Sequence, residues 1–96
     1  MLFTQNLALS KELTLDCMCV IEHTNTYIQL EPMTFDDKGK IKIKNKSVGK
    51  YTPAPDNNAI FGILEKSSFS YDFERGLFIQ SYDIDGKTIN CYGSCK

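Results

Sequence analysis

The stretch from Lys38 to Lys50 constrains the fold of this chain most, because its six lysines all occupy even-numbered positions. A β-strand has a side-chain period of two, so these lysines would project from one face of a strand. Ile41 and Ile43 would project from the opposite face. A helix would spread the same lysines around its circumference, so the pattern predicts a strand. The lysines are Lys38, Lys40, Lys42, Lys44, Lys46 and Lys50.

Other short segments alternate in the same way and are separated by turn residues. Residues 13–21 place leucine, cysteine and isoleucine at odd positions, which predicts a strand with its odd face in the core. Asp85-Gly86 is a hairpin-turn signal, and Gly76 fits the left-handed position of a three-residue loop. We therefore expect a mainly β fold, a small antiparallel meander of six to seven short strands. A curved sheet, a barrel and a sandwich all satisfy this pattern.

Residues 57–66 fit two structures. Asp56 is a helix-capping residue, and Ile60, Ile63 and Leu64 would form an apolar stripe on one short helix. Gly62 weakens a helix interior, and the isoleucines and phenylalanine favour a strand. We prefer the strand and keep the helix as the alternative. Residues 3–9 similarly fit either a short strand or one helical turn.

The length of 96 residues suits a single domain spanning 1–96. No window approaches the roughly 18 apolar residues of a membrane-spanning helix, so we expect no membrane partner. The N-terminal residues lack the basic and apolar regions of a secretory signal. These features predict a cytoplasmic protein, in which the cysteines would be reduced or metal-bound.

Four cysteines allow three interpretations. Buried thiols are the preferred one, because free cysteine is among the most buried residue types. If the first and last strands pair, the four sulfurs could instead hold zinc, with His23 as an alternative ligand. A C-x-C pair within a strand is not the usual zinc knuckle, which weakens that interpretation. In an oxidising environment we expect a Cys91–Cys95 disulfide. The candidate metal ligands are Cys17, Cys19, Cys91 and Cys95.

Catalytic motifs are absent from the sequence. His23 is the only histidine, so a Cys–His nucleophile pair would have to use it. No nucleophile elbow, phosphate-binding glycine loop or metalloprotease motif accompanies it. The chain is therefore predicted not to be an enzyme and to need no cofactor, with zinc as an independent possibility.

The charge distribution predicts a binding role. Removing the six lysines of residues 38–50 from the net charge of −1 leaves −7 on the rest of the chain. A lysine face on an acidic body would steer association with an acidic protein surface. We expect a non-enzymatic protein of inhibitor, immunity, adaptor or subunit type. A nucleic-acid-binding module using the 38–50 strand is the alternative. Lysines also protect edge strands from aggregation, which needs no partner.

Overall fold

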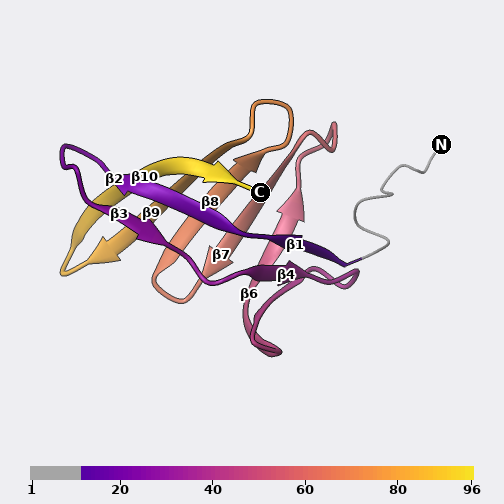
Figure 1. Cartoon of the computed structure of the whole chain (residues 1–96). Helices are drawn as coiled ribbons and strands as arrows, with labels where there is room; N and C mark the ends of the chain where they lie inside the picture. The colour runs from indigo at the N-terminus through magenta and orange to yellow at the C-terminus, as the bar shows by residue number, and fades with distance from the viewer. Residues whose placement is uncertain (1–11) are drawn as a thin grey trace.

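The computed structural model describes residues 12–96, which form one continuous antiparallel sheet (Figure 1). The described residues contain no helix that is long and apolar enough to cross a membrane. The earlier alternatives for residues 3–9 lie outside the described part of the chain. The strands are β1 Leu13–Leu15, β2 Cys17–Ile21, β3 Tyr27–Gln29, β4 Met33–Phe35, β5 Lys40–Ile43, β6 Lys46–Pro53, β7 Ala59–Leu64, β8 Ser67–Asp72, β9 Leu77–Ile84 and β10 Lys87–Cys95.

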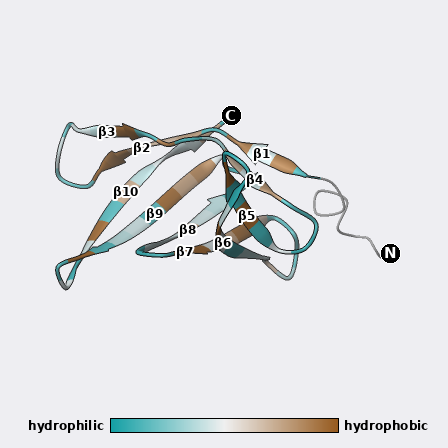
Figure 2. Cartoon of the chain, turned by 90° about the horizontal axis from the view of Figure 1, so that it is seen from below, coloured by the Kyte–Doolittle hydropathy of each residue, from teal (hydrophilic) through white to brown (hydrophobic). Residues whose placement is uncertain are grey.

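The sheet is a meander that curls back on itself like a half-barrel. Its strand order is β1-β4-β5-β6-β7-β8-β9-β10-β2-β3. The strands at the two ends of this order, β1 and β3, belong to one long hairpin. One arm consists of β1 and β2, which only Asp16 separates, and the other arm consists of β3 and β4. β1 pairs with β4 at one end of the order, and β2 pairs with β10 near the other. Seen from below, β1–β3 lie along one side and β6–β8 along the other (Figure 2).

The core lies inside this curl and follows the predicted alternation. In β2, Cys17 and Cys19 are almost fully buried while Met18 and Val20 are exposed. Aromatic rings fill the centre: Phe69 packs against Phe35 and Phe78, with ring centroids 6.0 and 5.5 Å apart. The buried apolar residues are Leu15, Cys17, Cys19, Met33, Phe35, Ile41, Tyr51, Ile60, Phe69, Tyr71, Phe78 and Cys91.

Two glycines allow strands to approach more closely than a side chain would permit. A Cβ at Gly93 in β10 would overlap the carbonyl oxygen of Met18 in β2. A Cβ at Gly62 in β7 would overlap the ring of Phe69. Both positions lie on the inner side of the curl, where neighbouring strands and side chains crowd together.

The structure corrects the predicted strand count and excludes the helix. There are ten strands rather than six to seven, because both arms of the first hairpin are interrupted and the lysine segment folds back on itself. Residues 59–64 form β7, so the alternative of a short helix near 57–66 is wrong. The hairpin turns at Asp85-Gly86 and at Gly76 are confirmed, with φ angles of 51°, 77° and 67°.

Candidate functional site

The six lysines do not share one face, because the 38–50 segment is a hairpin. Lys38 lies in the turn between β4 and β5, and Lys44 lies in the turn between β5 and β6. Lys44 and Asn45 both have positive φ, at 53° and 67°, which reverses the chain direction within two residues. The predicted strand is therefore correct for residues 40–43 and 46–50, but the turn at Lys44 and Asn45 divides it into two strands.

A β-bulge then moves one lysine to the other side of the sheet. Ile41 opposes Gly49 and Lys42 opposes Ser47, so β6 has one extra residue at this point. As a result Lys46 opposes Ile43, on the inner side. Three lysines remain together on the outer face: Lys40, Lys42 and Lys50. We call these three residues the lysine triplet.

Within the triplet, two lysines are directly opposed. Lys40 and Lys50 are register partners on β5 and β6, and both are exposed. Like charges at opposed positions destabilise a sheet. In the part of the chain that the structure describes, neither forms an ion pair with a carboxylate. Lys42 does, with Asp36 at 3.8 Å, and Lys44 pairs with Glu31 at 3.4 Å.

Asp36 fixes the hairpin turn that carries the lysines. Its Oδ1 accepts hydrogen bonds from the backbone N–H groups of Lys38 and Lys40, at 2.8 and 2.9 Å. The hydroxyl of buried Tyr51 donates to its carbonyl oxygen. The backbone hydrogen bond from Lys40 lowers the pKa of Asp36, and so do the backbone hydrogen bond from Lys38 and the charges of Lys42 and Lys38. These effects outweigh burial, which raises this pKa. Burial raises the pKa of Tyr51.

Apolar residues form a second outer-face feature, which the sequence analysis did not identify. Residues opposed across neighbouring strands share a face. The register connects Phe61 on β7 through Ser70 to Ile79 on β9, and then to Tyr92, Val20 and Tyr27 on β10, β2 and β3. We call Phe61, Ile79, Tyr92, Val20 and Tyr27 the outer apolar row.

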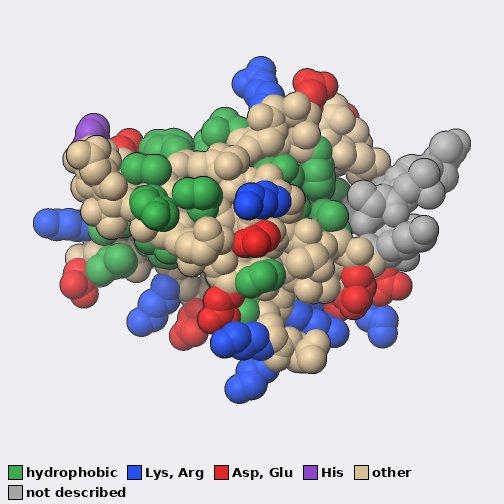
Figure 3. Space-filling view, in the orientation of Figure 1, with side chains coloured by type: hydrophobic (Ala, Val, Ile, Leu, Met, Phe, Trp, Pro, Cys, Tyr) green, Lys and Arg blue, Asp and Glu red, His purple; other side chains and the backbone are tan. Residues whose placement is uncertain are grey.

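The outer apolar row is accessible to a partner. Tyr27 and Phe61 are 63% and 50% exposed, and Ile63, next to Phe61 on the same face, is 69% exposed. Met18 and Leu77 widen the row on its other side. Figure 3 shows hydrophobic side chains reaching the surface where β2, β3 and β10 lie in Figure 1, with charged side chains gathered along the lower rim.

The outer apolar row and the lysine triplet adjoin each other on one surface. Lys50 is the register partner of Ile63, so the lysines begin where the apolar residues end. An open depression of about 360 Å³ lies along β8 between Phe61 and Ile79, with serines on its floor. The apolar signal was present in the sequence as Met18, Val20 and Ile63. It could not be recognised because strand alternation alone does not show which apolar positions the curl leaves outside.

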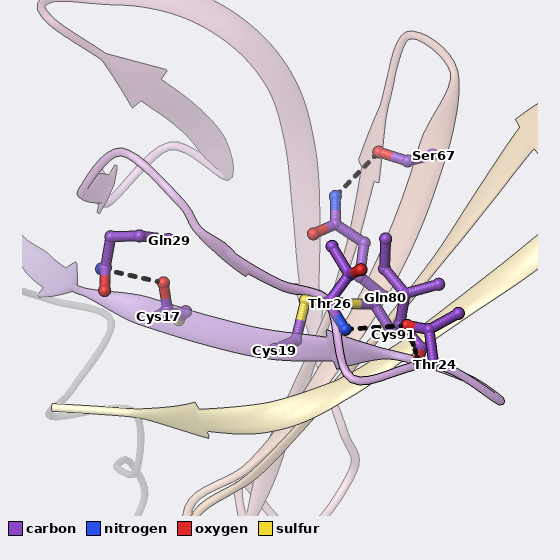
Figure 4. Close-up of a disulfide and its surroundings, with 9 residues drawn as sticks. Cys17, Cys19, Thr24, Thr26, Gln29, Ser67, Gln80 and Cys91 are labelled. Atoms are coloured by element: carbon purple, nitrogen blue, oxygen red, sulfur yellow. Dashed lines mark hydrogen bonds between the residues drawn. A yellow bond between two sulfur atoms is a disulfide. The ribbon is translucent and has the colours of Figure 1, made fainter.

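All four cysteines are disulfide-bonded, as Cys17–Cys95 and Cys19–Cys91. The pairing of first and last strands was a condition of the zinc interpretation, and β2 does pair with β10. The expected Cys91–Cys95 bond is wrong. β2 and β10 run antiparallel with Cys17 opposite Cys95, which directs each thiol toward the neighbouring strand. Figure 4 shows the Cys19–Cys91 disulfide in the interior beside Gln80, whose amide donates to Ser67. Cys17, Cys19 and Cys91 are buried as expected, but they are not free thiols.

Disulfide bonding also affects the zinc prediction. A cystine sulfur offers no thiolate to a metal, so zinc binding by these residues stays a prediction for the reduced chain alone. His23 is exposed in the turn between β2 and β3, with a φ of 67°. Within residues 12–96, no three histidine, cysteine, aspartate or glutamate side chains are grouped to hold a metal ion.

Comparison with models of known protein families, with curated proteins and with solved structures gives no match.

Proposed function

We propose that this protein is a non-enzymatic binding protein whose partner is another protein, and that the partner docks on the outer face of the curled sheet. The outer apolar row carries the proposal. It places two tyrosines, a phenylalanine and aliphatic side chains at the surface across several strands. Exposed apolar patches of this kind mark interaction sites, and tyrosine is enriched among the few residues that carry most of the binding energy in protein interfaces.

The lysine triplet gives the partner a charge preference. Lys40 and Lys50 lie beside the apolar residues without a carboxylate partner in the described chain, so a partner with acidic groups at its rim would match this surface. Such charges steer encounter and orientation more than they add affinity. The arrangement is an apolar centre flanked by charge, which is the usual anatomy of a protein interface.

A nucleic acid is the alternative partner, and the hairpin weakens it. Tracking a phosphate backbone needs a row of cations, whereas the outer face holds three of the six lysines. Asp36 also lies 3.8 Å from Lys42 and offsets part of its charge. We therefore prefer a protein partner.

The absence of a catalytic role in this proposal rests on the cysteines and on His23. Both disulfides remove the thiol nucleophile that a Cys–His pair would need. His23 is an exposed turn residue.

We also propose that the protein works in an oxidising compartment. The expectation of a cytoplasmic protein implied reduced or metal-bound cysteines. Two disulfides are typical of secreted and other oxidising environments, and cytosolic thiols are normally kept reduced.

Affinity capture with matched variants tests the docking surface. The full chain is immobilised, extract from its source is passed over it, and retained proteins are quantified by mass spectrometry. We expect Phe61→Ser with Tyr92→Ser to lose a protein that the wild-type chain retains. Ile84→Ser is the control, because Ile84 is also 50% exposed but belongs to the inner side at the end of β9.

Equal retention by the wild-type chain and the outer-face variant would contradict the proposal. Binding of a generic single-stranded oligonucleotide that weakens steeply with salt, and that requires Lys40 and Lys50, would favour the nucleic-acid alternative instead.

A further inference from the structure

The turn between β5 and β6 contains a motif that the proposed binding surface does not use. Residues 45–47 read Asn-Lys-Ser, which is the Asn-x-Ser/Thr acceptor pattern for N-linked glycosylation. The chain has six asparagines, and Asn45 is the only one followed two positions later by serine or threonine.

The structure presents this motif at the tip of a hairpin. Asn45 has a φ of 67° and is exposed, as are Lys44, Lys46 and Ser47. Asparagine is among the few residues that adopt this conformation readily. Asn45 and Ser47 line the same open depression, which has a volume of about 380 Å³. Among the hydrogen bonds formed by residues 12–96, none uses the Asn45 side-chain amide, so the amide nitrogen is accessible.

The disulfides provide an independent observation. They indicate a chain that folds in an oxidising compartment. In cells that attach N-linked glycans, the transfer takes place on chains entering the secretory route, where disulfides also form. An exposed acceptor motif and paired cysteines therefore point to the same cellular route.

We propose that Asn45 is an acceptor site for an N-linked oligosaccharide delivered on a lipid diphosphate. In the transfer, Asn45 Nδ2 forms a bond to the anomeric carbon of the first sugar and gives up one proton to a base of the transferase. The bond between that carbon and the diphosphate oxygen breaks, and the lipid diphosphate leaves with the electron pair. No oxidant or reductant takes part.

A glycan at this position extends from the lysine end of the outer face. Asn45 lines the same depression as Lys40 and Lys42, so the sugar lies next to the lysine triplet. Phe61 and Tyr92 belong to strands further along the sheet order, which leaves the outer apolar row uncovered. Glycosylation therefore restricts access to Lys42 more than access to the apolar half of the surface.

Secretion of the full chain from a eukaryotic host tests the proposal. A signal sequence is placed before Met1, and the product is analysed by intact mass and by peptide mapping before and after peptide N-glycosidase treatment. We expect a glycan mass on the peptide containing Asn45, removed by the glycosidase with conversion of Asn45 to aspartate. Ser47→Ala should abolish the glycan, and Ser47→Thr should retain it.

Tyr27→Thr is the matched positive control, since it completes an acceptor motif beginning at Asn25 in another exposed hairpin turn. Absence of a glycan from Asn45 in the secreted wild-type chain overturns the proposal. If the Tyr27→Thr chain is then glycosylated at Asn25 alone, the host is competent and the turn at Asn45 is what prevents glycosylation. Because the readout is mass and not binding, the result is independent of whether the outer apolar row has a protein partner.

Discussion

At the residue scale, Asp36 is the side chain on which the polar contacts of the lysine hairpin converge. Its carboxylate accepts two backbone hydrogen bonds, and its Oδ2 lies 3.8 Å from Lys42 Nζ. Asp36 is only 7% exposed. These interactions favour the charged carboxylate, so its pKa in the folded chain lies below the ordinary value of 3.8.

This lowered pKa predicts a specific pH dependence. The unfolded chain binds a proton at Asp36 before the folded chain does, so the stabilisation is complete above pH 3.8 and is lost as the pH falls through the lower folded pKa. We expect Asp36→Asn to lower the melting temperature at neutral pH and to flatten its decline on acidification. Asp37→Asn, at the exposed neighbouring carboxylate, is the control. Parallel melting curves for wild type and Asp36→Asn across the acid range would contradict this account.

Gly93 gives a second prediction at the residue scale. An alanine Cβ would overlap backbone atoms of Met18 and Cys19, which cannot rotate away as a side chain could. We expect Gly93→Ala to lower the free energy of unfolding by about 3 kcal/mol, the upper part of the range for overpacking. Ser94→Ala, at the adjacent exposed position, should change it by less than about 0.5 kcal/mol. Denaturant unfolding measures both, and a loss below about 1 kcal/mol for Gly93→Ala would show that the strands can separate.

At the scale of elements, the hairpin of β5 and β6 shows what the lysine pattern contained and what it concealed. The period of two correctly predicted the strand at 40–43 and the burial of Ile41. The lysines continue at even positions through the two-residue turn and past the one-residue bulge. The turn and the bulge change the face of the sheet on which these side chains lie, and the sequence alternation does not show this change. Lys44-Asn45 is a weak turn signal compared with Asp85-Gly86, which was recognised.

The opposed lysines of this hairpin predict a gain in stability on charge reversal. Lys50→Glu replaces repulsion with attraction across the register pair with Lys40, and we expect the free energy of unfolding to rise by about 0.5 kcal/mol. Lys46→Glu makes the same change of charge opposite Ile43 and should give no such gain. If the lysine triplet binds a partner, Lys50→Glu should also weaken that binding. Equal stability changes for the two variants would contradict a specific effect of the opposed pair.

β7 illustrates a different limit of sequence reasoning. Its outward residues Phe61 and Ile63 are as apolar as its inward residues, so the segment lacked the alternation that distinguishes a strand from a short helix. The feature that confused the secondary structure prediction is the one that now supports the binding surface. Local rules are broken most often where a surface has a second function.

At the scale of the whole molecule, the two disulfides are nested and act on the same seam between β2 and β10. They join residues 78 and 72 positions apart in the sequence. Once either bond exists, the other closes only the small ring between the pairs. From the sequence, pairing of the end strands was only a condition under which the four cysteines could meet, and choosing the disulfide partners required the register that places Cys17 opposite Cys95.

The nested arrangement predicts that the losses in free energy of unfolding on removing the two disulfides are strongly non-additive. On the chain-entropy model, the first bond stabilises by about 4.5 kcal/mol and the second by about 2 kcal/mol. We expect removal of Cys17 and Cys95, as a double alanine variant, to cost about 2 kcal/mol, and removal of all four to cost about three times as much. Replacing Cys19 and Cys91 adds a packing loss because both are buried. Additive losses, measured by denaturant unfolding, would contradict the nested arrangement.

The pairing of β2 with β10, which lie far apart in the sequence, has a consequence for biosynthesis. β2 is translated before β10, so β3 is its only neighbouring strand until β10 has been translated. Until Cys91 emerges, Cys17 and Cys19 have only each other to react with, and a bond between them would block the seam. We therefore expect productive oxidation to follow the synthesis of β10 and to be accelerated by a disulfide isomerase, which exchanges mispaired sulfurs.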